Sequence, residues 1–299
     1  MERRPPKSAA VTLPLGTTVG HLLRRAQQVH TARWAEEFDG DLTGPQYALL
    51  SALTQRPATD QRSAGRLASL DTSTAADIVA RLQRNGWLSR HRDPSDGRRY
   101  LLSLTAPARA ALQHITPRVA EIQRLLLEPL AADERAWFIN SLARVAYGGD
   151  PPKLPPEPSQ SRALPMPTTP GHLIRRGEQL HGIHWARRVG TTLTPPQYGL
   201  LAALAWNSPI DQRTAGDLAS LDKSSTADIV ARLARRALVT RAPDEKDRRR
   251  KLVVLTKTAR QLLQEITPTV ALVQQDLTAP LSGQDIDRFV DLLHTVAYR

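Results

Sequence analysis

Arginine side chains gather in two short segments of this chain. The first segment, residues 90–99, contains Arg90, Arg92, Arg98 and Arg99 around a turn-forming run, Asp93-Pro94-Ser95-Asp96-Gly97. The second segment, residues 241–251, contains Arg241, Arg248, Arg249, Arg250 and Lys251. Such cations neutralise backbone phosphates and release counterions from a polyanion. The pattern favours contact with nucleic acid, although a charged run can also be no more than a solvated face.

A second group of residues has the spacing needed to bind a small aromatic molecule. His30 and Trp34 are four residues apart, and the pair recurs as His181 and Trp185. Residues four apart share one face of a helix, so each pair offers a stacking ring beside a polar group. With their neighbours they form the candidate ligand-binding set: His30, Arg33, Trp34, His181, His184 and Trp185. The alternative is that both tryptophans are interface core and the histidines satisfy backbone groups.

The sequence gives little support for catalysis or for metal binding. The chain has no cysteine, which excludes disulfides, Cys-ligated zinc and iron–sulfur clusters. His181 and His184 are three residues apart, but two histidines without further ligands make a poor metal site. The sequence has no Gly-rich phosphate loop, no G-x-S-x-G elbow and no H-E-x-x-H helix. We therefore expect no enzyme, no metal and no cofactor.

The overall charge agrees with a polyanionic partner. Lys and Arg number 41 against 29 Asp and Glu, which gives a net charge of +12 at pH 7. No apolar stretch approaches the roughly 18–20 residues needed to span a bilayer. Residues 1–7 are basic but lack the apolar core of a signal peptide. We expect a cytoplasmic protein that has no membrane partner.

The elements that position these residues occur twice. His21-Leu22-Leu23-Arg24-Arg25 recurs 151 residues later as His172-Leu173-Ile174-Arg175-Arg176. The same offset relates 76–82 to 227–233, which are identical. A unit of this length is a domain and not a solenoid repeat. The sequence predicts a basic flexible arm over 1–16, a first domain over 17–147, a Pro-rich linker over 148–170 and a second domain over 171–299.

Each copy predicts the same order of elements. In the first copy, periodicity and start signals predict helices over 18–37, from Thr43, over 61–69 and over 74–85. Residues 87–92 and 100–104 read as two strands of a hairpin. Helices over 106–127 and 133–147 complete the copy. Two short helices joined by a tight turn form a helix-turn-helix, so the fold class is mainly α with small β wings.

This order of elements, followed by D-x-R-x-x-x-L-x-L-T, resembles the MarR family of winged-helix transcription regulators. The motif is Asp96-Gly97-Arg98-Arg99-Tyr100-Leu101-Leu102-Ser103-Leu104-Thr105 in the first copy; residues 247–256 take its place in the second, with Val253 at the position of the first leucine. The resemblance implies an obligate dimer built from first and last helices on a pseudo-palindromic operator. It also implies a cavity for small aromatic or phenolic acids. For a duplicated chain, we expect two winged-helix domains that form an intramolecular pseudo-dimer.

The resemblance makes the fourth helix the recognition helix, whose N-terminal residues meet base edges. The expected contacts are Thr72, Ser73, Thr74, Ala75, Asp77 and Arg81 in the first copy, and Lys223, Ser224, Ser225, Thr226, Asp228 and Arg232 in the second. Ser73 and Ser224 could instead be simple N-caps. Because Thr72 and Ala75 are replaced by Lys223 and Thr226, we expect an asymmetric operator.

The wing supplies the other expected contacts with DNA. Its residues are Arg92, Asp96, Arg98 and Arg99 in the first copy, and Asp247, Arg248, Arg249 and Arg250 in the second. The resemblance places Arg98 and Arg249 in the minor groove, where contacts select groove width more than sequence. Asp96 and Asp247 are expected to orient neighbouring arginines through charge-assisted hydrogen bonds.

The sequence therefore favours a sequence-specific regulator, a repressor released by a small aromatic ligand, whose partner is double-stranded operator DNA. Either one chain acts as a covalent pseudo-dimer or two tandem chains pair. Two alternatives stay open: an architectural DNA-binding protein that ignores sequence, and a ligand-binding module that has lost DNA binding. The wings and Arg81, kept as Arg232 in the second copy, argue against the latter.

Overall fold

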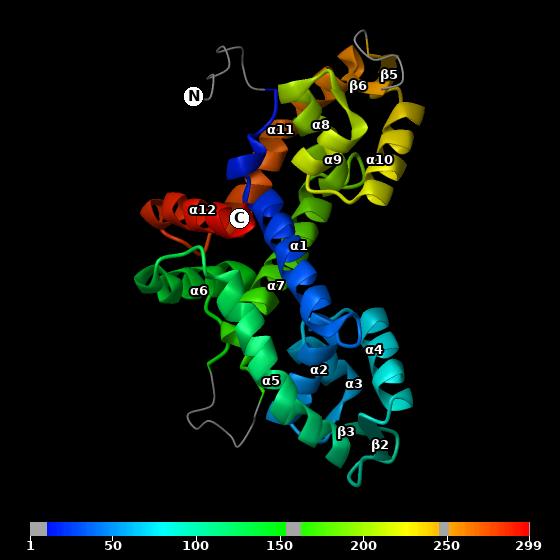
Figure 1. Cartoon of the computed structure of the whole chain (residues 1–299), viewed down its shortest axis with the longest axis vertical. Helices are drawn as coiled ribbons and strands as arrows, with labels where there is room; N and C mark the ends of the chain where they lie inside the picture. Colours follow the sequence, from blue (N-terminus) through cyan, green and yellow to red (C-terminus); the bar gives the residue numbers. More distant parts are fainter. Residues whose placement is uncertain (1–10, 154–162, 245–250, 299) are drawn as a thin grey trace. The chain divides into compact units, whose positions relative to one another are not determined.

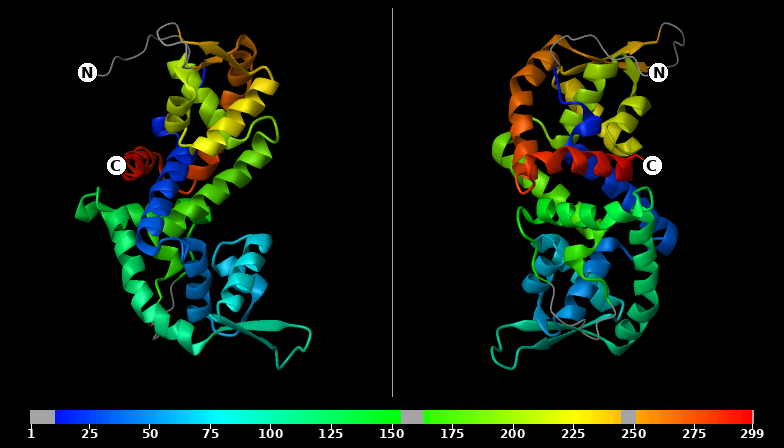
Figure 2. Two further views of the ribbon diagram at one scale, coloured as in Figure 1. Left: turned by 45° about the vertical axis from the view of Figure 1, so that its right-hand side comes forward. Right: turned by 90° about the vertical axis from the view of Figure 1, so that its left-hand side faces the viewer.

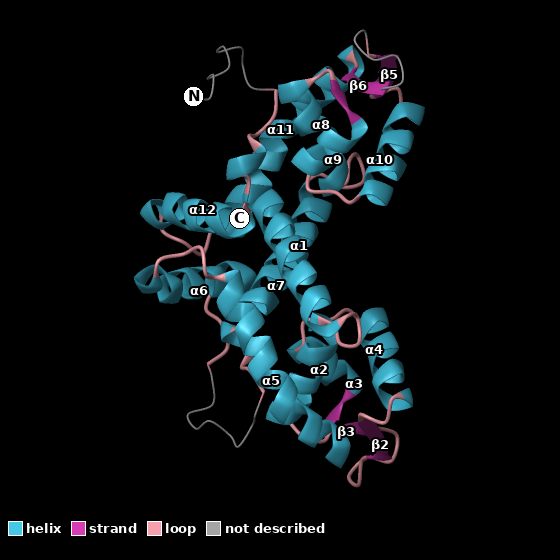
Figure 3. Ribbon diagram, viewed as in Figure 1, coloured by secondary structure: helices cyan, strands magenta, loops and turns pink. Residues whose placement is uncertain are grey.

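The computed structural model describes residues 11–153, 163–244 and 251–298. In these ranges the chain is mainly helical, and its strands are confined to two small antiparallel sheets (Figure 3). The chain divides into two compact units. The first unit is 26–176, and the second unit combines the residues up to Arg25 with 177–298. Each unit therefore contains segments from both sequence copies.

The first unit contains the end of helix α1 and the beginning of helix α7. Its elements in chain order are α1 (Val19–Phe38), α2 (Gly44–Gln55), β1 (Thr59–Asp60), α3 (Gln61–Leu67), α4 (Thr72–Arg84), β2 (Leu88–Arg92), β3 (Tyr100–Leu104), α5 (Ala106–Leu126), α6 (Ala132–Tyr147), the short 3-10 helix η2 (Met166–Thr168) and α7 (Pro170–Arg188). Figure 1 shows α2, α3 and α4 grouped beside the β2–β3 hairpin.

The second unit repeats this order. Its elements are the 3-10 helix η1 (Leu15–Thr17), the start of α1, the end of α7, α8 (Pro195–Asn207), β4 (Ile210–Asp211), α9 (Gln212–Leu218), α10 (Lys223–Arg235), β5 (Val239–Pro243), β6 (Lys251–Leu255), α11 (Lys257–Thr278) and α12 (Gly283–Ala297). The predicted order of helices and hairpins is confirmed in both copies.

Each hairpin belongs to a three-stranded sheet. In the first unit the strand order is β1-β3-β2, with Arg90 opposite Leu102 and Arg92 opposite Tyr100. The short outer strand β1 pairs Thr59 with Leu102 and was not predicted from the sequence. The second unit has the equivalent order β4-β6-β5. Figure 2 shows the β2–β3 hairpin as a ribbon that projects away from the helices of its unit.

Side-chain caps fix where the helices begin. Helix α2 begins with a capping box, in which the Thr43 hydroxyl accepts from Gln46 N and the Gln46 side chain accepts from Thr43 N. Asp60 caps α3, and Asp71 caps α4. Helix α4, the expected recognition helix, therefore begins at Thr72, two residues before the predicted start. The caps satisfy backbone N–H groups that have no partner within the helix.

Residues expected in the arm and linker are packed against a domain core. In the second unit, Val11, Leu13 and Leu15 pack on the core, and Leu13 N donates to the Tyr198 hydroxyl at 3.2 Å. In the first unit, Leu164 N donates to the Tyr47 hydroxyl at 3.0 Å. We call residues 11–17 and 163–169 the two straps. The prediction of a free arm is therefore wrong for 11–16, and residues 1–10 lie outside the described ranges.

Candidate DNA-binding surface and ligand cavity

The exposed face of helix α4 carries most of the residues predicted to meet DNA. Thr72, Ser73, Asp77 and Arg81 are exposed, and Thr74 is half-buried. On α10, Lys223, Ser224, Asp228 and Arg232 are exposed, and Ser225 is half-buried. Arg232 is paired with Asp228 across one helical turn, Nη2 to Oδ2 at 2.6 Å. These side chains lie at the helix N-terminus or on its outward face, where a duplex could reach them.

The prediction of DNA contact is wrong for two residues of these helices. Ala75 and Thr226 are each 3% exposed, because they lie on the inward face of their helices. A Cβ atom on Gly65 would stand 2.9 Å from the Ala75 Cβ, so α3 and α4 are in close contact there. The Thr226 hydroxyl donates to Asp222 O at 2.7 Å. Neither side chain offers surface to DNA.

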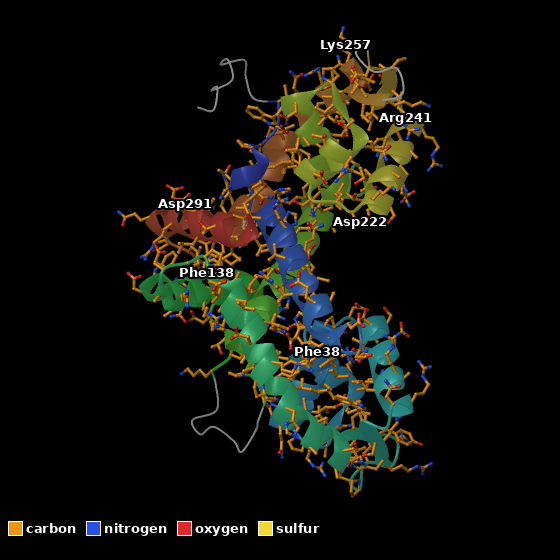
Figure 4. All side chains as sticks on the ribbon, in the orientation of Figure 1. Phe38, Phe138, Asp222, Arg241, Lys257 and Asp291 are labelled. Atoms are coloured by element: carbon orange, nitrogen blue, oxygen red, sulfur yellow. The ribbon has the colours of Figure 1, made fainter. Side chains whose placement is uncertain are left out.

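The hypothesis that serines cap the recognition helices is also wrong. Asp71 is the cap of α4, and its carboxylate accepts from Thr74 N at 2.9 Å and from the Ser73 hydroxyl at 2.6 Å. Asp222, labelled in Figure 4, makes the equivalent contacts at the start of α10. These hydrogen bonds hold the pKa of both carboxyl groups well below the usual range. The serines remain at the helix N-terminus as exposed hydroxyls.

Cations line the exposed wing of the first unit. The Arg90 guanidinium lies 4.1 Å from the centre of the Tyr100 ring, a cation–π contact across the hairpin. Arg92 and Arg98 are exposed. Arg99 Nη2 is 3.0 Å from Asp60 Oδ2, so the cap residue of α3 also holds the base of the wing. The hairpin is thereby attached to the helix-turn-helix.

The predicted role of Asp96 is wrong. Its carboxylate accepts from the backbone N–H of Arg98 at 3.0 Å, as an Asx turn does, and does not orient a guanidinium. Arg99 is held by Asp60 and, at 3.9 Å, by Asp93. In the second copy, the predicted wing residues Asp247, Arg248, Arg249 and Arg250 lie outside the described residues. Arg241 on β5 is exposed and is labelled in Figure 4.

A cavity of about 170 Å³ opens in the first unit between α1, α2, α5 and the beginning of α7. Its walls include the predicted His30 and Trp34, together with Gln27, Gln123 and Arg175. Trp34 stacks on Phe38 with ring centres 5.1 Å apart, so it belongs to the core and the cavity wall at once. Both hypotheses for this tryptophan describe part of its environment.

His30 is a neutral hydrogen-bond donor in this cavity. Burial, and then the nearby Arg175 charge, lower its pKa to about 3. Its Nε2 accepts from the Trp34 indole N–H at 2.8 Å. Since an indole nitrogen only donates, the proton of the neutral ring is on Nδ1. That Nδ1 is buried and has no partner among the described residues.

Arg175 supplies the positive charge of the cavity. Burial and the neighbouring Arg176 lower its pKa to about 10, so it stays charged at neutral pH. His172 stays neutral, because burial lowers its pKa to about 3. Sequence reasoning missed Arg175 and proposed Arg33, which lies outside the cavity wall and pairs with Glu36 at 3.0 Å. His184 is likewise outside the equivalent cavity and faces Asp276 at 3.6 Å.

The same arginine holds the turn of the helix-turn-helix. Arg175 Nη1 donates to Ser69 O and Nη2 donates to Ala68 O, each at 2.6 Å. Arg176 Nη1 donates to the Ser69 hydroxyl at 2.9 Å. Ser69 has a φ of +52°, a left-handed conformation that a non-glycine residue adopts only when its surroundings fix it. The repeated His-Leu-(Leu/Ile)-Arg-Arg motif therefore connects the cavity to the turn before α4.

Other kinds of site are not seen in the part of the chain that is described. No cluster of three or more His, Asp or Glu side chains in the described ranges could hold a metal ion. The described helices include none with the length and apolarity required to traverse a bilayer.

The family models match one segment in each copy of the repeat. Two models described as MarR family match residues 191–250 and 42–100. Transcriptional regulator HosA of Escherichia coli is 33% identical over 125 residues, covering 42% of this chain and 92% of HosA. The HTH-type transcriptional repressor NicR of Pseudomonas putida is 32% identical over 128 residues, covering 42% of this chain and 81% of NicR.

Among solved structures, the PcaV transcriptional regulator of Streptomyces coelicolor, in complex with its natural ligand, is 38% identical. The match covers 45% of this chain and 96% of PcaV, with a TM-score of 0.43. HosA, NicR and PcaV are all named as regulators or repressors of transcription.

Proposed function

Because the chain belongs to the MarR family, we propose that it binds a double-stranded DNA operator and releases it when a small acidic ligand enters the first unit's cavity. The exposed faces of α4 and α10 each contact base edges in a major groove, and the wing arginines contact phosphates. The observation that carries the proposal is Arg175, which lines the cavity and also donates to the turn before α4.

The chemistry of the cavity selects the ligand class. Apolar and aromatic walls favour a ring, and a cavity of roughly 150 Å³ is known to accept a benzene-sized molecule. The buried Arg175 guanidinium favours a carboxylate, since charge-assisted hydrogen bonds to this group are the stronger kind. The unpartnered Nδ1–H of His30 is a donor for a second ligand oxygen. The ligand is therefore a single-ring aromatic acid.

Competition for Arg175 couples the cavity to DNA. The guanidinium now satisfies two carbonyl groups, Ser69 O and Ala68 O. A carboxylate is a stronger acceptor than a carbonyl, so a bound ligand draws Arg175 away from the turn. Ser69 then loses contacts that hold it in its left-handed conformation, and helix α4 shifts relative to its groove. A ligand shifts this equilibrium only by its difference in affinity for the two states.

One chain supplies both halves of the regulator. Residues 163–176 belong to the first unit, although 171–176 are the start of the second copy, and residues 11–25 belong to the second unit. An exchange of this kind within one chain makes a dimer-like regulator without a second subunit. Because the exposed Thr72 is replaced by Lys223, the two half-sites differ, and the operator is an imperfect palindrome.

The test is a titration of the chain with its own upstream intergenic DNA and with a scrambled duplex of equal length, at two salt concentrations. We expect the upstream DNA to be preferred by roughly a thousandfold or more, in a complex whose mass contains one chain. Equal, salt-sensitive binding to both duplexes would instead identify an architectural protein. A complex with two chains would show that tandem chains pair.

A further inference from the structure

The second unit has a cavity at the position equivalent to the first, but it is almost filled. It measures about 20 Å³, against about 170 Å³ in the first unit. The equivalent walls are conserved in type, because His181, Trp185 and Arg24 take the places of His30, Trp34 and Arg175. A volume of about 20 Å³ holds roughly one water molecule and no aromatic ring.

Two differences in sequence between the copies account for part of the smaller volume of the second cavity. Position 44 is glycine in the first copy, and its counterpart in the second copy is Pro195, whose ring lines the small cavity. Ala48 has Gly199 as its counterpart. The Arg24 Nη2 atom lies 3.0 Å from the point where a Cβ on Gly199 would stand, so Arg24 occupies space that an alanine would contest.

The charge near the arginine also differs between the two units. The counterpart of Gln27 is Glu178, so the second unit contains a carboxylate where the first has a neutral amide. Burial lowers the pKa of Arg24, and the Glu178 charge opposes that shift; burial raises the pKa of Glu178, and the Arg24 charge opposes it. In the first unit the Gln27 Oε1 atom is buried without a partner among the described residues.

The aromatic donors also differ. The Trp185 indole N–H donates to Leu193 O at 2.6 Å and is thereby used by the backbone of its own loop. The equivalent Trp34 donates to His30, which leaves a free donor on the other side of that imidazole. The second cavity therefore lacks the volume of the first, and its indole N–H is already used by a backbone carbonyl.

We infer that each chain takes one aromatic carboxylate, in the first unit only, because the second cavity has no room for an aromatic ring. This inference rests on the proposed function, because it assigns the stoichiometry of the ligand that function requires. Regulation is then one-sided: the ligand acts on helix α4, while helix α10 stays independent of it.

The test counts bound ligands by 19F NMR of 4-fluorobenzoate added in excess to the full chain, with 4-fluorobenzamide as the uncharged control. We expect one bound resonance with the acid and none with the amide. The substitution Gln27→Glu should weaken binding at least tenfold by supplying an internal carboxylate. The matched change Glu178→Gln, combined with Pro195→Gly and Gly199→Ala, should produce a second bound resonance. Circular dichroism melting identifies any variant that fails to fold.

The outcomes separate this inference from the proposed function. Two bound resonances in the unaltered chain, or one that survives Arg175→Gln and disappears in Arg24→Gln, would overturn the one-site assignment and leave ligand-controlled DNA binding intact. No bound resonance at millimolar acid would overturn both. A single resonance that is lost in Arg175→Gln and retained in Arg24→Gln supports the assignment.

Discussion

Replacing Tyr47 with phenylalanine should destabilise the first unit by removing one of the hydrogen bonds that hold its strap. The Tyr47 side chain is 2% exposed, yet its hydroxyl joins three parts of the unit. It lies 3.2 Å from the Thr116 hydroxyl on α5 and accepts from Leu164 N at 3.0 Å. The substitution keeps the ring and removes only these two hydrogen bonds, so it tests the attachment of the strap and not core packing.

The expected cost follows from the burial of the partners. A buried donor left unsatisfied costs about 1–3 kcal/mol. Thr116 and Leu164 are half-buried, so water can replace part of the loss and the lower half of that range applies. We expect a loss of about 1–2 kcal/mol in the free energy of unfolding, which lowers Tm by about 2–8 °C. Thermal melting followed by circular dichroism measures this shift.

Two further variants test whether the loss of stability is specific to the buried tyrosine hydroxyls. Tyr198→Phe should cost a similar amount, because the Tyr198 hydroxyl makes the equivalent contacts with Leu13 N at 3.2 Å and Thr267 at 3.1 Å. Tyr100→Phe is the control, since Tyr100 is 39% exposed and lies on the wing. A loss below about 0.5 kcal/mol for both buried tyrosines would refute the attachment of the straps by these hydroxyls.

Three other changes have defined outcomes. Arg98→Ala should lower DNA affinity and reduce the slope of log affinity against log salt by about 1, measured by fluorescence anisotropy, and an unchanged slope would argue against a phosphate contact. Leu82→Ala should cost about 2–5 kcal/mol in urea unfolding and abolish DNA binding, because this side chain, 3% exposed, anchors α4 to the core. Acidification from pH 7 to pH 5 should lower stability by up to about 2 kcal/mol for each of His30 and His172. Their pKa values are about 3 in the folded chain, so only the unfolded chain is protonated in that window; a constant urea midpoint over this range would contradict it.

The order of elements was predictable because local signals and the duplication agree. Thr43 and Pro45 mark the start of α2, and the Asp-Gly turn between 93 and 99 marks the hairpin. The signals at the start of α2 recur in the second copy as Thr194 and Pro196, although Asp247-Arg248 stands in place of the Asp-Gly pair. The helix-turn-helix and the wing follow directly, and with them most of the exposed residues that we propose contact DNA.

The errors on the recognition helix have local causes. Asp71, Ser73 and Thr74 are all good cap residues, and composition alone does not decide among them. Asp71 is the cap because its carboxylate accepts from Thr74 N and from both neighbouring hydroxyls. Hydrophobic periodicity would have predicted the burial of Ala75, since this residue shares one helix face with the buried Val79 and Leu82.

The sequence alone did not identify Arg175 as the cation of the cavity. Arg175 meets Ser69 and Ala68 across more than a hundred residues of chain, and only the tertiary packing brings them together. The packing of the straps had a weaker signal in the sequence. Leu13-Pro14 recurs as Leu164-Pro165 at the offset of the duplication, but the high proline content indicated a linker.

In the proposed function, a ligand in the first cavity controls DNA binding through Arg175. The most direct measurement is the anisotropy of labelled upstream DNA, bound to the full chain, while benzoate is added and its occupancy is followed in parallel. We predict release of the DNA as the cavity fills, and no release with benzamide. A cavity occupied by benzoate while the complex with DNA stays equally tight would contradict the account.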